Sequence, residues 1–379
     1  MQFGLTDEQR AIQDVARRFT AEAITPHAAL WDEKCIFPRK TVKSAAELGF
    51  AAICVSAKWG GAGLGRLEAA LIMEAMSHGC PSTSAFISIH NMAAWMIDRF
   101  ASASLAAKYL PAMNTGEKLA SYCLTEPGSG SDAAALKTTA KRDGGAYVVT
   151  GSKAFISGGG ENDLYLTMVR TGGEGPKGIS CLVIEKDMAG VSFGAQERKL
   201  GWHSQPTAQV NFDGVRVPIE NLVGAEGQGF RIAMQALDGG RINISACSLG
   251  GAQRCLDEAL GYTHQRRQFG QALTEFQATQ FTLADMETNL QASRALLYQA
   301  AEKVTAGAPD ATRSAAVTKR FVTDTCMHVA DRALQLHGGY GYLRDFPIER
   351  IFRDLRVHSI LEGTNEIMRV IIARDMLRQ

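Results

Sequence analysis

The sequence lacks the features that would place it in a specialised class of protein. Its 379 residues contain no apolar run of the roughly 18–20 residues that a membrane-spanning helix needs. Its 40 basic and 39 acidic side chains are interspersed and leave a formal net charge of +1, so we expect no broad basic surface. The composition therefore favours a protein that binds neither nucleic acid nor membrane.

Paired metal or redox ligands are missing as well. The eight cysteines are scattered, and the closest two, Cys247 and Cys255, are not at the spacing of a zinc site or a redox dithiol. The eight histidines include no His-Glu-x-x-His pattern. We therefore predict no metal site, and we expect buried thiols in a reducing compartment. The absence of a basic or apolar leader favours a cytoplasmic chain, or a mitochondrial matrix protein whose transit peptide has been removed.

What is present is typical of a soluble globular protein, with 46% hydrophobic and 21% charged residues. Thr6 and Gln9 have the spacing of a capping box, and a helical pattern continues to about residue 118. From 119 to 225, short β-rich runs alternate with turns and no helical segment intervenes, which predicts an antiparallel sheet or small barrel. These runs cover 147–150, 164–169, 179–184 and 208–212.

From residue 226 onward, the sequence is again helical and rich in alanine and leucine. Long helices are predicted over 230–264, 276–306 and 311–336, and short links between them suggest a bundle. The order along the chain is therefore helical, then β, then helical, which predicts an α+β fold.

One acidic residue near the C-terminus is the strongest candidate for chemistry. Glu362 stands between Leu361 and Gly363, just before a helix for which Thr364 is a suitable N-cap. The glycine lets a ligand approach the backbone, and an apolar ligand closing over the carboxylate would raise its basicity. The alternative is a solvated acid at a helix entry.

Two segments of the β region have the composition of ligand-binding loops. In 122–132, small residues let backbone N–H groups converge on an acceptor, and Thr125 and Ser131 add hydroxyl groups. The loop matches neither a dinucleotide fingerprint nor a Gly-x-Ser-x-Gly elbow, and it could be a surface turn. In 151–158, Phe155 could form a wall for a planar cofactor and Ser157 a polar handle, or Phe155 could lie in the core.

Three segments of the C-terminal helices are unusual. The pair Gly239-Gly240, between Asp238 and Arg241, costs about 1 kcal/mol of helix stability per glycine, which indicates a close approach to the backbone or a helix break. In 266–270 an arginine could grip a phosphate, and an aromatic could pack on a ligand, although a helix C-cap has the same composition. The segment 335–342 ends a helix in glycines, as a Schellman-type stop also would.

In their order and spacing, these segments resemble the acyl-CoA dehydrogenase family over essentially the whole chain. The similarity extends through 88–98, 201–207 and 240–244, where the chain resembles the branch that acts on isobutyryl-CoA in valine breakdown more than the straight-chain branches. The resemblance implies an N-terminal α-helical domain, a middle antiparallel β domain and a C-terminal four-helix bundle. The corresponding ranges are 1–118, 119–225 and 226–379.

The resemblance also implies FAD as cofactor and acyl-CoA as substrate. Residues that would border FAD within the same chain are Tyr122, Leu124, Thr125, Gly130, Ser131, Phe155, Ile156, Ser157, Thr364, Asn365 and Glu366. Residues that would reach FAD from a neighbouring subunit are Arg266, Phe269, Phe276, Gln277, Gln335, Leu336, His337, Gly338 and Gly339. Residues that would hold the substrate are Ser131, Asp238, Gly239, Gly240, Arg241 and Arg374. Many relatives have tryptophan and threonine at the positions of Phe155 and Ser157.

In the chemistry that the family implies, Glu362 removes the α-proton of the thioester while the β-hydride passes to the flavin. Electrons then pass to an electron-transfer flavoprotein, and the enzyme is a homotetramer, a dimer of dimers. Some branched-chain relatives have their catalytic carboxylate at the position of Gly240, which cannot act as a base here.

Other functions stay open at this point. The substrate could be 2-methylbutyryl-CoA or butyryl-CoA, because a methylene is worth only about 1–3 kcal/mol in an apolar pocket. The enzyme could instead be an oxidase that uses O₂. A non-catalytic or DNA-binding flavoprotein of the same fold is disfavoured by the near-neutral charge and by the presence of Glu362.

Overall fold

The N-terminal part of the chain is helical, and its first helix begins where the sequence predicts. The Thr6 hydroxyl accepts the backbone N–H of Gln9 at 3.2 Å, and the Gln9 side chain accepts the N–H of Thr6 at 3.0 Å, so the capping box is confirmed. The helices are α1 (Asp7–Phe19), α2 (Ala28–Glu33), α3 (Arg39–Glu47), α4 (Arg66–Gly79), α5 (Pro81–Phe100) and α6 (Ala103–Asn114). The computed structural model describes residues 4–378.

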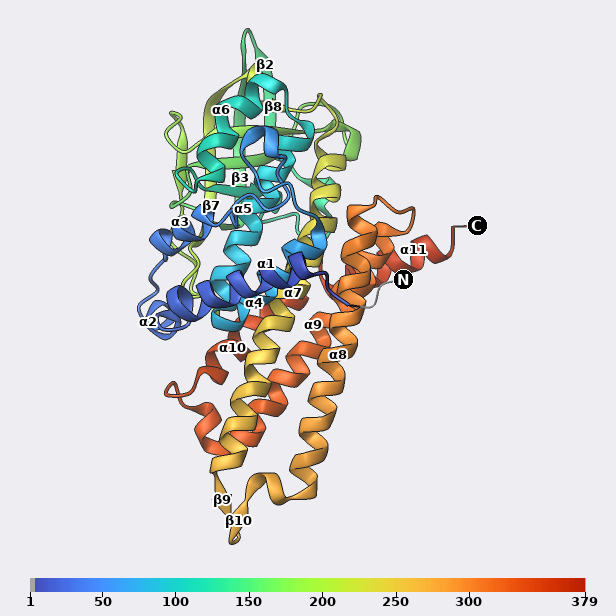
Figure 1. Cartoon of the computed structure of the whole chain (residues 1–379). Coiled ribbons are helices and arrows are strands. Elements are labelled where there is room, and N and C mark those ends of the chain that lie inside the picture. The colour runs from blue at the N-terminus through green and yellow to red at the C-terminus, as the bar shows by residue number, and fades with distance from the viewer. Residues whose placement is uncertain (1–3, 379) are drawn as a thin grey trace.

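A sheet follows, and Figure 1 shows it at one end of the molecule. Its strands are β1 (Ala120–Cys123), β2 (Thr139–Asp143), β3 (Ala146–Ser157), β4 (Leu164–Arg170), β5 (Ile179–Glu185), β6 (Val191–Phe193), β7 (Thr207–Pro218) and β8 (Leu222–Val223). The order is β6-β7-β3-β2-β4-β5-β8, with β1 beside β4. The predicted strands are therefore present, and helices α5 and α6 pack against the sheet.

The sheet differs from the prediction in one respect, because it is not purely antiparallel. β1 pairs with β4 in parallel over 120–123 and 164–167, and β2 meets β4 in parallel at Thr139 and Arg170. Parallel neighbours need a long connection. The β2–β3 hairpin supplies it for β1, a long-range arrangement that local alternation of residues does not reveal.

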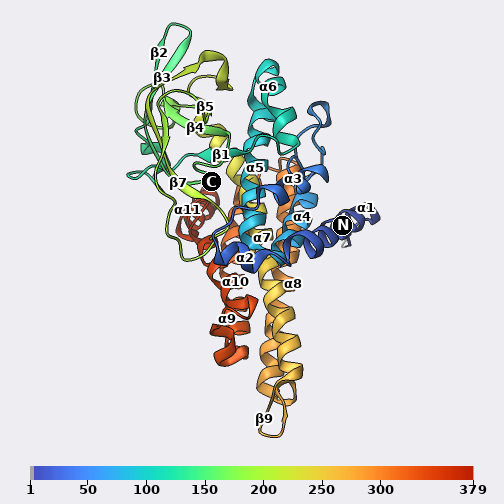
Figure 2. The same cartoon turned by 90° about the vertical axis from the view of Figure 1, so that its left-hand side faces the viewer.

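The C-terminal part of the chain is a set of long helices. They are α7 (Gly229–Gln265), α8 (Gln277–Thr305) and α9 (Ala311–His337), followed by the shorter α10 (Pro347–Arg356) and α11 (Asn365–Met376). The hairpin of β9 (Arg267–Gln268) and β10 (Gln271–Ala272) joins α7 to α8 at the end of the bundle away from the sheet (Figures 1 and 2). The predicted order of a helical, a β and a helical region is confirmed.

Helix α7 connects the two ends of the molecule. Its 37 residues span about 55 Å at 1.5 Å per residue, and it contacts α4, α5, α8 and α9 on the way. The stretch 239–252 is buried throughout. Within residues 4–378, no helix combines the length and the apolar character that crossing a membrane requires.

Candidate active site

The Glu362 side chain points inward onto α7 from a strained turn. Glu362 has a φ of +54°, in the left-handed region that non-glycine residues rarely occupy, and Gly363 follows at +90°. Its Oε2 atom is buried and has no hydrogen-bond partner among the described residues. A Cβ atom added at Gly240 of α7 would stand 2.5 Å from that oxygen. The carboxylate therefore packs directly over a helix backbone, so the solvated alternative is wrong.

The surroundings of Glu362 bring the pKa of its carboxyl group close to neutral pH. Burial raises the pKa of its carboxyl group to about 7, although the positive charges of Lys319 and Arg241 oppose this rise. A general base is most effective when its pKa lies near the working pH. Burial first, then the charges of Cys181 and Glu362, raise the pKa of Tyr122 on β1, so the phenol is neutral beside this carboxylate.

Hydrogen bonds from two helices hold the turn that carries Glu362. Lys319 Nζ on α9 donates to the carbonyl of Gly363 at 2.8 Å and to Oδ1 of Asn365 at 2.9 Å. Arg241 Nε on α7 lies 3.4 Å from the carbonyl of Glu362. The Thr364 hydroxyl accepts the backbone N–H of residue 367 at 3.3 Å, so its predicted role as N-cap of α11 is confirmed.

The two adjacent glycines of α7 do not break the helix, which runs through them without interruption. The close approach inferred from them is made by side chains of the same chain. The guanidinium of Arg66 on α4 lies 2.5 Å from where a Cβ of Gly239 would be, and it covers the Trp95 ring at 5.0 Å. Glu362 takes the corresponding place over Gly240.

Sequence reasoning missed Arg66 and Lys319. Lys319 is fully buried, and its position on α9 is part of the apolar stripe formed by Ala315, Val322 and Cys326. A charged residue at helical spacing within an apolar stripe was the available signal. Arg66 had no such signal, because its partners lie on other elements.

Two neighbouring segments of the β region present an aromatic wall and a polar handle. Phe155 has a φ of +57° and is 67% exposed, at an irregularity in the pairing of β3 with β7, so the core alternative is wrong. Gln205 Nε2 donates to the Ser157 hydroxyl at 2.6 Å, which leaves the Ser157 proton free to donate. Ile156 is buried in the sheet, so it offers a ligand only its backbone.

The loop that follows β1 is open on one side and anchored on the other. A Cβ at Gly128 or Gly130 would meet nothing within 4 Å, and Ser131 is exposed. Beneath the loop, Lys153 Nζ donates to Glu126 Oε1 at 2.8 Å in a buried ion pair. An exposed, strained aromatic, a free hydroxyl proton and an open glycine loop together fit a planar cofactor with polar edges.

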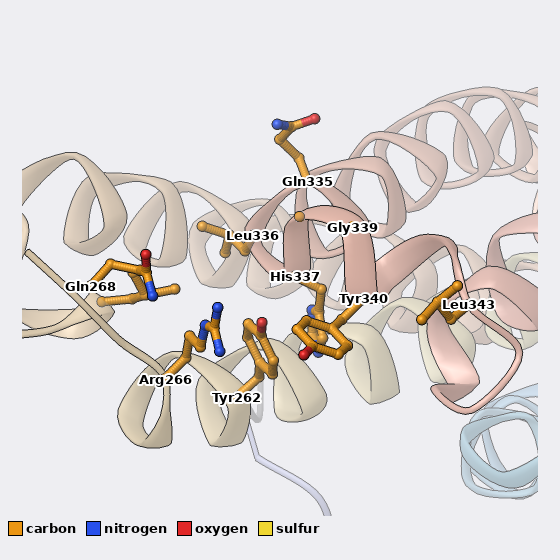
Figure 3. Close-up of a pocket in the computed structure, with 11 residues that line it drawn as sticks. Tyr262, Arg266, Gln268, Gln335, Leu336, His337, Gly339, Tyr340 and Leu343 are labelled. Atoms are coloured by element: carbon orange, nitrogen blue, oxygen red, sulfur yellow. The ribbon is translucent and has the colours of Figure 1, made fainter.

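The cofactor residues predicted to act from a neighbouring subunit lie at the other end of the bundle. Arg266, Gln335, Leu336, His337, Gly338 and Gly339 line a hollow of about 460 Å³ near β9 (Figure 3). Arg266 lies over the Tyr340 ring at 5.5 Å. Phe269, which is 94% exposed at a φ of +52°, meets Phe276 at 6.3 Å between ring centres. Arg266 is the C-cap of α7 in extended backbone, and Gly270, at a φ of +81°, lies in the β9–β10 turn, so the glycine does not cap the helix.

These two groups of residues are far apart in the chain described here. Gly240 and Arg266 are 26 residues apart along α7 and its C-cap, which corresponds to about 39 Å at 1.5 Å per residue. Gln277 lies at the start of α8, beside the hairpin that follows Arg266. Glu366 lies in the first turn of α11, close in sequence to Glu362, and is exposed. Arg374 is exposed on α11, and the described residues give it no contact with the Glu362 turn. The predicted site residues therefore include a nearer cluster around Glu362 and Gly240 and a distant cluster around Arg266.

The remaining substrate candidates lie beside Glu362. Asp238 accepts from Arg241 Nη1 at 2.8 Å and from the Thr312 hydroxyl at 2.6 Å, and Arg241 is buried.

Two cofactor candidates, Leu124 and Thr125, lie in the segment after β1. Leu124 is buried in the cluster between the helices and the sheet, and the carbonyl of Thr125 accepts the N–H of Ala154 at 2.9 Å.

The chain matches three protein-family domains, one after another along its length. They are the acyl-CoA dehydrogenase N-terminal domain over residues 6–117, the middle domain over 121–215 and the C-terminal domain over 227–377. Among curated relatives, the mitochondrial isobutyryl-CoA dehydrogenase of Dictyostelium discoideum is 54% identical, and the match covers 98% of this chain and 90% of that protein. The corresponding Bos taurus protein is 51% identical over 99% of this chain and 90% of its own length.

Solved structures agree over the full length. Butyryl-CoA dehydrogenase from Megasphaera elsdenii has a TM-score of 0.97 and 36% identity, with 100% of each chain covered. A chain in a structure described as the electron transferring flavoprotein of Acidaminococcus fermentans has a TM-score of 0.98, 40% identity and complete coverage of both chains. PigA with FAD and proline has a TM-score of 0.96 and 30% identity, with 99% of each chain covered.

Proposed function

Because this chain belongs to the acyl-CoA dehydrogenase family, we propose that it converts isobutyryl-CoA to methacrylyl-CoA in valine breakdown. Membership makes the protein an FAD-dependent oxidoreductase. Full-length similarity to two isobutyryl-CoA dehydrogenases supports the choice of substrate. The observation that carries the reaction is the buried, unpaired carboxylate of Glu362.

Glu362 supplies both groups that proton removal requires. The hydrogen on the α-carbon of an acyl thioester is only weakly acidic, so its removal needs an oriented base and a donor to the developing enolate-like oxygen. The Glu362 carboxylate is the base. Its own backbone N–H makes no hydrogen bond within residues 4–378 and is available to the thioester oxygen. When bound, FAD accepts the hydride from the β-carbon.

The other residues of the nearer cluster would hold FAD and the acyl-CoA thioester in position relative to each other. Phe155 would provide an apolar surface for the flavin ring, and the Ser157 hydroxyl could donate a hydrogen bond to it. The open loop around Gly130 would hold the polar part of the cofactor and the start of the thioester. Asp238 and Arg241, which are paired at 2.8 Å, border the CoA side of the substrate.

The separation of the two clusters supports a shared cofactor. Arg266 lies about 39 Å along α7 from Gly240, and the 335–339 segment lines the same hollow as Arg266, so both clusters reach one FAD only if two chains contribute. We assign the distant cluster to FAD bound mainly by a neighbouring subunit, within a homotetramer built as a dimer of dimers. Light scattering of the FAD-loaded enzyme tests this assembly, and a stable FAD-loaded monomer would contradict it.

The electrons leave to an electron-transfer flavoprotein in this proposal. The similarity to a chain in the Acidaminococcus structure supports this acceptor. Reduction of a purified electron-transfer flavoprotein, compared with peroxide formation in air, separates a dehydrogenase from an oxidase. We place the protein in the cytoplasm, and cell fractionation would instead find it in mitochondria if the matrix alternative holds.

Anaerobic titration of the FAD-loaded enzyme with different thioesters tests the substrate. Isobutyryl-CoA is expected to bleach the flavin absorbance at lower concentration and faster than 2-methylbutyryl-CoA or butyryl-CoA. Differences of about 10–200-fold correspond to one methylene in an apolar pocket. Preference for butyryl-CoA would overturn the choice of a branched substrate but leave the dehydrogenase activity standing.

A further inference from the structure

Lys319 of α9 is a buried cation whose hydrogen bonds all go to the segment that carries Glu362. Its side chain is fully buried, and Nζ donates to the carbonyl of Gly363 at 2.8 Å and to Oδ1 of Asn365 at 2.9 Å. Both acceptors are neutral, so among the described residues no carboxylate contacts this ammonium at hydrogen-bond distance. Burial of a charge without such a partner is expensive and calls for a functional reason.

The charge of Lys319 persists at neutral pH and acts on Glu362. Burial lowers the pKa of Lys319 to about 8, and the charge of Glu362 opposes this lowering, whereas Arg241 adds to it. A pKa of about 8 keeps the amine mostly protonated at pH 7. Asp324 of α9 and Glu366 of α11 also act on Lys319, but neither is buried.

The other charged or titratable groups around Glu362 do not replace this charge. Arg241 of α7 also acts on Glu362, but its guanidinium is paired with the Asp238 carboxylate at 2.8 Å. Tyr122 of β1 and Cys247 of α7 both feel the carboxylate, and burial raises the pKa of each, so both are neutral. Lys319 is therefore the cation near Glu362 that no carboxylate contact neutralises.

We propose that Lys319 is a positioning residue for the catalytic base. Its two hydrogen bonds fix the left-handed turn at Glu362 and Gly363, and its charge keeps the Glu362 carboxylate ionised inside an apolar site. This inference rests on the proposed function, in which Glu362 must be ionised to remove a proton.

The geometry explains why one side chain serves both purposes. Glu362 and Gly363 have φ values of +54° and +90°, and such a turn persists only where its surroundings hold it. Lys319 bonds the carbonyl directly after the base. Asn365 is itself fixed, because its Nδ2 donates to the Thr323 hydroxyl at 3.0 Å and to Asp324 at 2.7 Å.

The pH dependence of turnover separates the charge of Lys319 from its hydrogen bonds. In the FAD-loaded enzyme, Lys319→Gln keeps a donor and removes the charge, Lys319→Arg keeps the charge, and Lys319→Met removes both. We expect the acid limb of kcat/KM to move to higher pH by about 1 unit in the Gln and Met variants. At pH values below that limb, kcat/KM of the Gln and Met variants should be about tenfold lower than that of the wild type. Lys319→Arg should keep the limb near its wild-type position.

A second variant tests the positioning role without any change of charge. Thr323→Val loosens Asn365, so we expect kcat to fall while the acid limb of kcat/KM stays in place. Lys303→Met is the matched control, because Lys303 pairs with Asp310 at 2.7 Å on the outside of the bundle. An unmoved limb in Lys319→Gln, or an equal shift in Lys319→Arg, would overturn the electrostatic role. An unchanged kcat in Thr323→Val would overturn the positioning role.

An infrared titration keeps the test independent of turnover. The carboxyl band that disappears in Glu362→Gln reports the protonation of Glu362 directly, and in Lys319→Gln we expect it to titrate at higher pH. If the wild-type enzyme fails to oxidise isobutyryl-CoA, the proposed substrate is wrong, yet this titration still decides the role of Lys319. An unshifted band in Lys319→Gln would overturn that role, and the Gln variant serves even if Lys319→Met does not fold.

Discussion

The Glu362 carboxylate occupies the space in which a side chain at Gly240 would begin. A Cβ at Gly240 would stand 2.5 Å from Oε2 and 3.0 Å from Cδ of Glu362. The proposed base thus comes from the turn before α11, and Gly240 of α7 leaves space for its carboxylate. A side chain at position 240 would therefore have to displace the Glu362 carboxylate from its observed place.

We predict that Gly240→Ala damages catalysis more than stability. The added methyl group displaces the Glu362 carboxylate, and displacement of a catalytic group by about 1 Å can lower kcat by about 100-fold. The measurement is kcat with isobutyryl-CoA, with circular dichroism to check the fold. Gly261→Ala is the matched control on the same helix, because a Cβ there meets nothing within 4 Å. That control should keep its activity and gain up to about 1 kcal/mol of stability.

Glu362→Gln should retain FAD but lose the ability to reduce it with substrate. The amide has nearly the shape of the acid and cannot accept the α-proton, and loss of a general base typically lowers the rate by about 10²–10⁴-fold. Stopped-flow absorbance of the bound flavin measures this rate directly. Near-normal bleaching would reject Glu362 as the base.

The raised pKa of Glu362 predicts how turnover depends on pH. The base is active when unprotonated, so kcat/KM should rise about tenfold per pH unit up to about pH 7 and then level off. The profile should be recorded between pH 5 and pH 9 with the wild-type enzyme, in buffers of constant ionic strength. A limb near the ordinary glutamate value of 4.5 would contradict the desolvated site.

The same raised pKa predicts that Glu362 destabilises the folded protein at high pH. A carboxyl group whose pKa rises from 4.5 to about 7 on folding binds its proton more tightly in the folded state, so stability falls as pH rises between these values. Above pH 7 the loss is about 3 kcal/mol. Glu362→Gln should therefore have a higher Tm than wild type at pH 8, with the gain disappearing near pH 5. Glu220→Gln, at an exposed position, should change the Tm little at either pH.

Local features of the sequence predicted the residues whose partners are nearby in the chain. Thr364 caps its own helix, and the Glu362 turn is recognisable from Gly363 and the following cap. The long helices α7, α8 and α9 agree with the predicted segments to within a few residues, because each segment is rich in alanine and leucine.

Features that depend on distant contacts could not be predicted in the same way. Lys319 bonds a carbonyl 44 residues later, and Arg66 packs against Gly239 on an element from another part of the fold. The outward direction of Phe155 follows from an irregularity in the pairing of β3 with β7, which a period of two residues does not reveal. A lysine in an apolar stripe and two glycines in a helix were anomalies in the sequence, but neither anomaly identified the partner residue.

Mixing two inactive variants tests whether the two residue clusters serve one cofactor. If FAD lies between chains, Arg266→Ala spoils the contribution of a chain to its neighbour's site, whereas Glu362→Gln spoils its own. A mixed pair then has one site with both groups intact and one site with both lost. Random reassembly makes half of the pairs mixed, so about a quarter of the wild-type activity should return. If instead each chain binds its own FAD with both clusters, no mixed pair contains an intact site. Activity that stays at the level of the unmixed variants after subunit exchange, confirmed by mass spectrometry, would therefore exclude the shared site.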